Sequence, residues 1–256
     1  MAKFILVLVS ICILIGAALT KSFRNNDHTN NKDSAEQSKV VLELFTSEGC
    51  SSCPPADELA AKLQKQFGDQ LYVLEFHVDY WDRLGWKDPY SLALATQRQR
   101  IYGERLKLES IYTPQAIING SDEAVGSDAN KINSLIRKEI TSKSIASLSL
   151  RAESSSANEI LCRYEYHGPA AKINIALCQS ESEIQVKAGE NNGKKLHHTN
   201  IVRDFRQADP SHNQGKSEIR LEIPSGLNTA NMSVIAYAQE TEGKIVAASE
   251  VKPGVK

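Results

Sequence analysis

Two cysteines three positions apart are the residues of this chain whose type and spacing point most directly to chemistry. Cys50 and Cys53 follow an apolar run that predicts a buried strand over Val40–Thr46. Pro54-Pro55 then begins a helical pattern, since proline is tolerated in a first helical turn. Cβ atoms three positions apart on a helical turn lie about 5–6 Å apart, which suits a disulfide that closes and reopens. Because a helix N-terminus favours thiolates, the pair predicts a redox centre.

Other uses of this cysteine pair stay open. A permanent structural disulfide has the same spacing. A zinc site is disfavoured, because zinc takes four ligands and no second close pair of cysteines follows. Copper bound by Cys50, Cys53 and His77 is a third alternative, because soft thiolates and imidazole suit copper. We prefer a packing role for His77, and the redox interpretation needs no metal and no diffusible cofactor.

The first residues predict export. Lys3 precedes an apolar run to Leu19 that is short for a membrane-spanning helix and suits a signal peptide over residues 1–20. The small residues near Ala17 make a mediocre cleavage site, so an uncleaved N-terminal anchor is the alternative. Residues 21–38 are polar and predict a flexible linker. We therefore expect the periplasm or cell envelope, where disulfides persist.

Composition excludes one class of partner and leaves room for two domains. The formal net charge is −1 over 256 residues, so no strongly basic surface for nucleic acid is expected. Residues 39–143 alternate strands and helices, as an α/β domain does. Its strands are expected at Val40–Thr46, Leu71–Val78, Ile111–Ile118 and Glu123–Val125, and its helices from Pro54, over Pro89–Leu106 and after Asp128.

Residues 144–256 show a different pattern. Short strands separated by polar connections predict an antiparallel, sandwich-like domain. Cys162 and Cys178 fall in consecutive strands, and a hairpin between these strands would place the two thiols nearly opposite each other. A structural disulfide is therefore predicted, with two buried free thiols as the alternative.

The first domain resembles the thioredoxin fold, through the strand–CxxC–helix unit and the Thr113-Pro114 pair that leads into a hairpin. The resemblance implies that Pro114 is cis and faces the dithiol. It also implies that Thr113 offers backbone hydrogen bonds to a bound peptide, and that the helix over Pro89–Leu106 is an insertion. Thioredoxins carry a buried acid before the dithiol; strand alternation turns Glu43, the nearest candidate, to the other face.

A more specific resemblance covers the chain from about Lys39 to its C-terminus. Its motifs are Leu44–Asp57, Phe76–Asp82, Leu84–Trp86, Tyr112–Gln115, Gly189–Asn191 and Val202–Asp204. They are similar to an exported, thioredoxin-like family filed as domain of unknown function 1223. This resemblance implies a fold and leaves the activity to be argued from the residues.

Residues near the dithiol complete the predicted site. Tyr80, Trp81 and Trp86 are expected to wall the site or to seal the inserted helix against the core. The alternative to packing for His77 is an approach to the dithiol, where it would be part of the same wall. Asp79, Asp82 and Asp88 are expected to cap the same loop. His197-His198 is expected to be solvated.

These observations favour an exported thiol–disulfide oxidoreductase. Cys50, expected to be nearer the helix start and more exposed, would attack, and Cys53 would resolve the mixed disulfide. Thr113 and Pro114 would bind the substrate backbone. The expected partners are protein thiols or disulfides, including a redox partner in the membrane or envelope. The alternatives are a non-catalytic envelope binding module on a thioredoxin-like scaffold and a copper-handling chaperone.

Overall fold

The computed structural model describes residues 38–208 and 215–254, which fall in one compact unit, Ala35–Lys256. The predicted signal peptide or anchor, and all of the predicted linker except its last residue, lie outside the described residues. Within these residues, no helix has both the length and the apolar character needed to cross a membrane.

The elements follow the predicted order in the first half and are almost all strands in the second. The helices are α2 (Pro54–Phe67), α3 (Ala93–Arg105) and α4 (Ala129–Ile140), with short 3₁₀ turns η1 (Gly68–Gln70), η2 (Asp79–Leu84) and η4 (Thr229–Asn231). The strands are β1 (Val40–Thr46), β2 (Leu71–His77), β3 (Gln115–Ile118), β4 (Asp122–Val125), β5 (Ser147–Ser156), β6 (Glu159–His167), β7 (Ala171–Gln185), β8 (Lys195–Ala208), β9 (Gly215–Glu222), β10 (Met232–Glu240) and β11 (Ile245–Val251).

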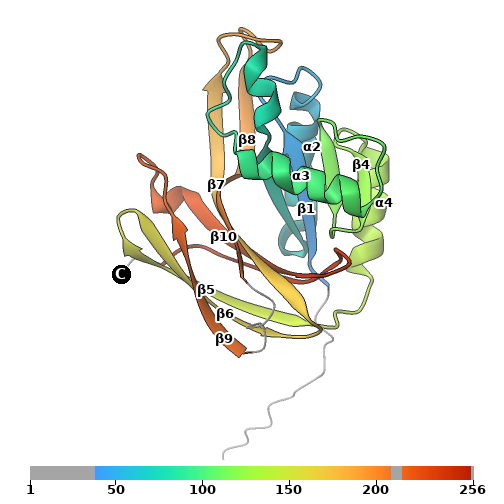
Figure 1. Cartoon of the computed structure of the whole chain (residues 1–256), viewed down its shortest axis with the longest axis vertical. Coiled ribbons are helices and arrows are strands. Elements are labelled where there is room, and N and C mark those ends of the chain that lie inside the picture. The colour runs from blue at the N-terminus through green and yellow to red at the C-terminus, as the bar shows by residue number, and fades with distance from the viewer. Residues whose placement is uncertain (1–37, 209–214, 255–256) are drawn as a thin grey trace, which may run out of the picture. The chain divides into compact units, whose positions relative to one another are not determined.

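An eight-stranded mixed sheet organises the molecule. Its strand order is β11-β10-β7-β8-β2-β1-β3-β4. β2 runs parallel to both β1 and β8, and the other neighbouring strands are antiparallel. β1 and β2 are buried along their whole length, which explains why their sequences are continuous apolar runs. Figure 1 shows the long β7–β8 hairpin beside these strands.

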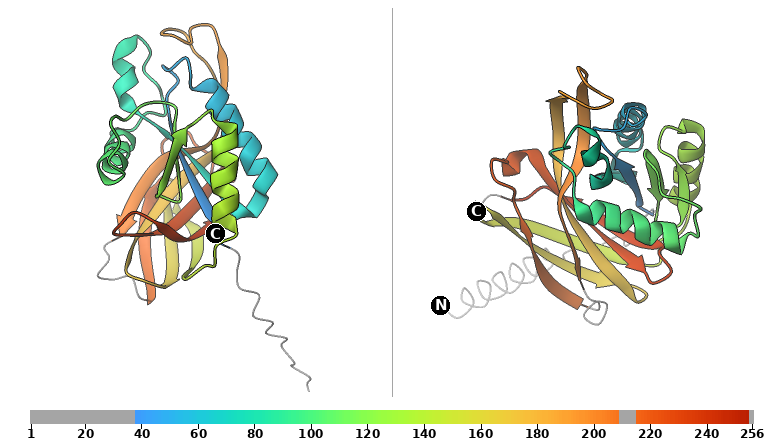
Figure 2. Two further views of the ribbon diagram at one scale, coloured as in Figure 1. Left: turned by 90° about the vertical axis from the view of Figure 1, so that its right-hand side faces the viewer. Right: turned by 45° about the horizontal axis from the view of Figure 1, so that its top comes forward.

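Helices cover both faces of the first half of this sheet. α2 and α4 pack on one face, where Leu42 and Leu44 of β1 join their buried side chains. α3 packs on the other face, where Phe45 meets Tyr102. The left view of Figure 2 shows the sheet between these helices. Side chains that alternate along β1 therefore face different helices, and α2 brings the cysteine pair to one face only.

The second half forms a two-layer arrangement, but one layer belongs to the large sheet. β5, β6 and β9 make a separate antiparallel sheet. It packs on β7, β10 and β11 through an apolar core that includes Tyr164, Ile175 and Val234. The predicted sandwich-like packing is therefore present, whereas β7, β8, β10 and β11 extend the sheet of the first half. Strands from both sides of the expected boundary at residue 143 thus share one sheet.

Candidate functional site

Cys50 and Cys53 form a disulfide at the N-terminus of α2. Their Cα atoms lie 5.5 Å apart, and the Cys53 amide donates to the Cys50 carbonyl over 3.2 Å. Cys53 is the N-cap of α2, and Pro54 and Pro55 occupy its first turn. The predicted junction is confirmed, but Cys53, and not Cys50, lies nearer the helix start.

The peptide bond before Pro114 is cis, as the thioredoxin resemblance implies, and it lies beside the disulfide. The Thr113 carbonyl oxygen is 3.8 Å from Cys50 Sγ. Behind the proline, the Gly126 amide donates to the Pro114 carbonyl over 2.8 Å. A Cβ atom on Gly126 would come within 2.9 Å of Pro114 Cβ, so this close approach requires glycine.

The helix α3 positions the Thr113-Pro114 loop. Gln99 is fully buried, and its Nε2 donates to the Tyr112 carbonyl over 2.7 Å and to Gln115 Oε1 over 2.9 Å. Trp81 Nε1 donates to Thr113 Oγ1 over 2.8 Å. Residues on both sides of the cis bond are thus held by side chains from the inserted helix and from η2.

The predicted aromatic residues contact the site directly. Trp86 Nε1 donates over 2.7 Å to Oε2 of Glu48, a residue two positions before Cys50 in the chain. Tyr80 reaches α3, where its hydroxyl donates to Gln99 over 3.3 Å. Trp81 packs so closely on Gly49 that a Cβ there would lie 3.2 Å from Trp81 Cβ. Trp81 and Trp86 therefore lie against the residues just before Cys50, and Tyr80 contacts α3.

A loop from the second half closes over the dithiol. Asn191, between β7 and β8, donates from Nδ2 to the Glu48 carbonyl over 2.8 Å and to the Cys50 carbonyl over 2.9 Å. Glu190 Oε2 accepts a hydrogen bond from the Ser51 amide over 3.0 Å. Both cysteines are buried, with Cys50 1% exposed and Cys53 0% exposed. The expected difference in exposure is therefore negligible, and neither cysteine is open to solvent in this structure.

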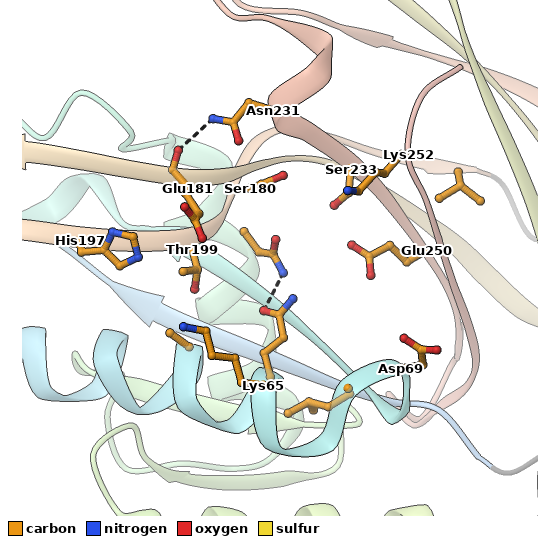
Figure 3. A pocket seen from close by; sticks show the side chains of 16 residues that line it. Lys65, Asp69, Ser180, Glu181, His197, Thr199, Asn231, Ser233, Glu250 and Lys252 are labelled. Atoms are coloured by element: carbon orange, nitrogen blue, oxygen red, sulfur yellow. Dashed lines mark hydrogen bonds between the residues drawn. The ribbon is translucent and has the colours of Figure 1, made fainter. Parts of the chain in front are cut away.

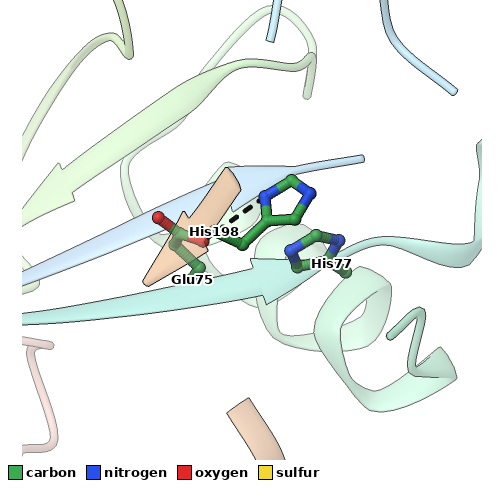
Figure 4. Close-up of side chains that lie close together, drawn as sticks. All are labelled: Glu75, His77 and His198. Carbon is green, nitrogen blue, oxygen red and sulfur yellow. Dashed lines mark ion pairs between the residues drawn. The ribbon is translucent and has the colours of Figure 1, made fainter. Parts of the chain in front are cut away.

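Six buried ionisable side chains form an acid–imidazole cluster on the α2 side of the sheet. Its members are Glu48, Asp57, Glu75, His77, Asp88 and His198. Asp88 Oδ2 lies 2.7 Å from His77 Nδ1, and the two imidazole ring centroids are 4.8 Å apart. Figure 4 shows Glu75 and His77 from β2 beside His198 from β8. His77 therefore has the packing role that we preferred, but the side chains around it are ionisable.

Burial and ion pairing move the pKa values of these groups in different directions. Burial raises the pKa of Asp57 and raises that of Glu75 well above its usual range. Burial also disfavours a charged His77, but the Asp88 carboxylate outweighs this and raises the imidazole pKa. In return, His77 and the amide donors at its oxygens hold the pKa of Asp88 below its usual value despite burial. Asp88 also caps the loop through the Tyr90 amide, as predicted.

His198 is the functional-site residue that the sequence analysis missed. It was expected to be solvated with His197, but its exposure is 0%, whereas His197 is exposed. The signal was present in β8, where alternate residues Leu196, His198 and Asn200 are all buried. Strand alternation separates the two histidines onto opposite faces.

The predicted disulfide between Cys162 and Cys178 is wrong. Both are buried free thiols. Their strands do not form a hairpin pair, because β6 lies in the three-stranded sheet and β7 in the eight-stranded one. The two thiols also belong to different apolar cores. Burial raises the pKa of Cys162 to about 12, so this thiol is inert at neutral pH.

A cavity of about 550 Å³ lies away from the cysteines, at the C-terminal end of α2. Figure 3 shows side chains from α2, β8 and β11 around it, including Lys65, His197 and Glu250. Thr199 also lines the cavity, and it donates to Glu75 from both its amide and its hydroxyl. The cavity therefore borders the acid–imidazole cluster and not the disulfide.

Comparisons with known proteins agree on the fold. Protein AGR_C_4864 from Agrobacterium tumefaciens is 30% identical, with a TM-score of 0.61, over 84% of this chain and 95% of that chain. HBP35 of Porphyromonas gingivalis is 16% identical, also with a TM-score of 0.61, over 85% of this chain and 76% of that chain, and shares the fold alone. No curated protein matches in sequence.

The family comparison covers both halves of the molecule. Residues 41–239, from β1 to β10, match the family described as protein of unknown function (DUF1223). The matched range contains the cysteine pair, the cis proline, the Asn191 loop and His198. The chain therefore belongs to the DUF1223 family.

Proposed function

We propose that this chain is an exported thiol–disulfide oxidoreductase built on a thioredoxin-like scaffold. One observation carries the proposal: the Cys50–Cys53 disulfide begins α2, and Cys50 Sγ faces the carbonyl before the cis proline at 3.8 Å. A substrate strand that pairs with the Thr113 backbone would arrive next to this sulfur. Helix N-termini also stabilise the thiolate that the chemistry requires.

The proposed step transfers two electrons and two protons. A substrate thiolate attacks Cys50 Sγ, the Cys50–Cys53 bond breaks, and Cys53 leaves as a thiolate that takes up a proton. A second substrate thiolate then attacks the mixed disulfide at the substrate sulfur. The products are a substrate disulfide and the reduced Cys50–Cys53 dithiol, and the reverse sequence reduces a substrate disulfide.

Substrate access requires the covering loop to move. Because both sulfurs are buried, Glu190 and Asn191 must withdraw from the Ser51 amide and from the Glu48 and Cys50 carbonyls. The hydrogen bonds from Trp81 and Gln99 would keep the Thr113-Pro114 loop in place meanwhile. We propose that the partners are protein thiols or disulfides in the periplasm or cell envelope, where such bonds persist.

Mixed-disulfide trapping tests this proposal. A Cys53→Ser variant expressed in the native compartment should accumulate mixed disulfides on Cys50, because the resolving thiol is missing. Cys50→Ser is the first control, and Cys162→Ser the second, since Cys162 is a buried thiol in another core. Trapped species should appear only with Cys53→Ser and vanish on reduction. Their absence, together with a wild-type disulfide that resists mild reductant, would support the non-catalytic binding module.

A further inference from the structure

The acid–imidazole cluster contains more carboxyl groups than imidazoles. Four carboxyl groups, of Glu48, Asp57, Glu75 and Asp88, face two imidazoles. Full ionisation would therefore leave two excess negative charges, even with both rings protonated. The Arg203 guanidinium lies 4.9 Å from the Tyr90 ring centroid. Its positive charge interacts electrostatically with the Asp88 carboxylate. Buried charges of one sign need a compensating partner, which a bound cation or bound protons can supply.

Several buried atoms of the cluster have no hydrogen-bond partner. These atoms are Glu48 Oε1, His77 Nε2 and both ring nitrogens of His198. Buried polar atoms are almost always satisfied, so each of these needs an explanation. One ligand atom from each of Glu75, His77 and His198 lies within 4.8 Å of the others. The unpartnered nitrogens therefore belong to a group of side chains with the spacing of metal ligands.

Neighbouring groups orient these side chains as they do at metal sites. The Asp88 carboxylate holds His77 Nδ1, which leaves Nε2 free. Imidazole ligands of metals commonly use one nitrogen for a carboxylate and the other for the ion. Glu75 is fixed by the amide and hydroxyl of Thr199. His198 Nε2 lies 3.6 Å from Glu48 Oε1, which is too far for a hydrogen bond, so Glu48 is a neighbouring charge that does not hold the His198 ring as Asp88 holds His77.

We propose that Glu75, His77 and His198 bind one divalent transition-metal ion of the zinc type, as the three protein ligands of a tetrahedral site with an open fourth position. His198 Nδ1 lies 3.7 Å from Glu75 Oε2, and one ligand atom from each of the three side chains lies within 4.8 Å of the others. Two ligands on a tetrahedral zinc ion are separated by about 3.3 Å, so the side chains must draw together by about 0.4 to 1.5 Å when the ion binds. Two imidazoles with a carboxylate are a known zinc ligand set. The site uses neither cysteine and does not depend on the proposed redox function.

Zinc titration of the full chain tests this site. The purified protein is stripped with a chelator under native conditions and titrated with ZnCl₂ against a chromophoric indicator. One equivalent should bind, and His198→Gln should weaken binding about 100-fold or more. His197→Gln is the matched control, because its exposed ring lies on the other face of β8, and it should leave the affinity unchanged. Asp88→Asn should weaken binding about 10- to 100-fold through His77.

Cobalt substitution supplies a second measurement, whose first part uses wild-type protein and whose second part uses a double variant shown by circular dichroism to be folded. Co²⁺ in wild-type protein should give visible bands of a tetrahedral site without a thiolate charge-transfer band. The Cys50→Ser, Cys53→Ser double variant should give the same spectrum. The proposal is overturned if wild-type protein does not bind stoichiometric zinc, if His197→Gln and His198→Gln weaken binding equally, or if the double variant loses the metal. The trapping experiment reports on the cysteines alone, so the two proposals fail separately.

Discussion

Arg98 connects the inserted helix to the centre of the sheet through one buried ion pair. Its Nε and Nη2 donate to the two Glu43 carboxylate oxygens over 2.7 and 2.6 Å. The guanidinium also lies 5.0 Å from the ring centroids of Tyr102 and Phe205. Gln99, the next residue, holds the Tyr112 carbonyl beside the cis bond. The ion pair therefore fixes the helix that positions the Thr113-Pro114 loop, and Glu43 faces away from α2, as strand alternation predicts.

Breaking this pair on one side should destabilise the protein strongly. Glu43→Gln leaves a buried guanidinium without its counter-charge, and we expect a loss of about 3–5 kcal/mol in the free energy of unfolding. The measurement is urea unfolding followed by circular dichroism. The combined Glu43→Leu, Arg98→Met variant should recover most of the loss, because it removes both charges together.

Arg163 provides the matched control for the ion-pair prediction. It pairs with Glu153 and Glu218, but its side chain is 49% exposed. Arg163→Ala should therefore cost only about 0–1 kcal/mol. A cost for Glu43→Gln no larger than that for Arg163→Ala would show that the buried pair does not anchor α3.

At the scale of elements, local signals predicted the first half well. The apolar run of β1 and the prolines that begin α2 are found where expected. Asn119-Gly120, a sequence typical of a hairpin turn, forms the turn between β3 and β4 with positive φ at both residues. Polar residues follow Gln179, so the sequence predicts two separate strands, over Lys172–Gln179 and Glu183–Lys187. In the structure one strand, β7, continues to Gln185, with alternating exposed positions. Beyond Gln179 this extension is supported by pairing with β8, the next strand along the chain.

The contact between the β7–β8 loop and the cysteine pair joins residues more than 140 positions apart, so it could not be predicted from local sequence. Gly189–Asn191 matched a family motif, but nothing local shows that its side chains reach the CSSC turn. That contact exists because β7 and β8 carry the loop past β2 to α2. Gly189, with a φ of 72°, also lets the loop approach Trp86, since a Cβ there would lie 3.1 Å from Trp86 Cβ. Contacts between elements, and not propensities, therefore complete the site.

Asn191→Ala should make the Cys50–Cys53 disulfide more accessible. The change removes two buried hydrogen bonds to the Glu48 and Cys50 carbonyls. The Cys50 carbonyl keeps the bond from the Cys53 amide, whereas the Glu48 carbonyl loses its Asn191 donor. We expect the disulfide to react faster with dithiothreitol, with a loss of about 1–3 kcal/mol in the free energy of unfolding. Asn192→Ala is the control, because this neighbouring side chain is exposed. Equal reduction rates for the two variants would mean that the loop does not limit access.

At the scale of the whole molecule, the two halves share a core as well as a sheet. Val202, Ile235 and Tyr237 from the second half pack with Phe45 and Tyr102 from the first. Phe45 and Tyr102 would lose these neighbours, and would become more exposed, in any polypeptide that ended before β7. Burial of apolar area on this scale is the main source of folding free energy, so neither half keeps its full core alone.

Hydrogen bonds also join the two halves of the chain, near the Asn119-Gly120 turn. The Ile245 amide donates to the Asn119 carbonyl over 2.9 Å, and Asn119 Oδ1 accepts from the Val41 amide over 2.8 Å. Gln239 Nε2 donates to the Tyr102 hydroxyl over 2.9 Å. Strand β11 thus holds the hairpin turn that follows the cis-proline loop. The boundary expected at residue 143 separates two sequence patterns whose structures depend on each other.

The whole chain should therefore unfold in one cooperative transition, and a polypeptide ending at residue 143 should not fold stably. Both tryptophans, Trp81 and Trp86, lie in the first half, so their fluorescence reports on that half, whereas far-ultraviolet circular dichroism reports on both. In urea the two signals should give coincident midpoints for the whole chain. The truncated polypeptide should give a broad transition or none. Separate midpoints, or cooperative unfolding of the truncated form, would show that residues 39–143 are an independent domain.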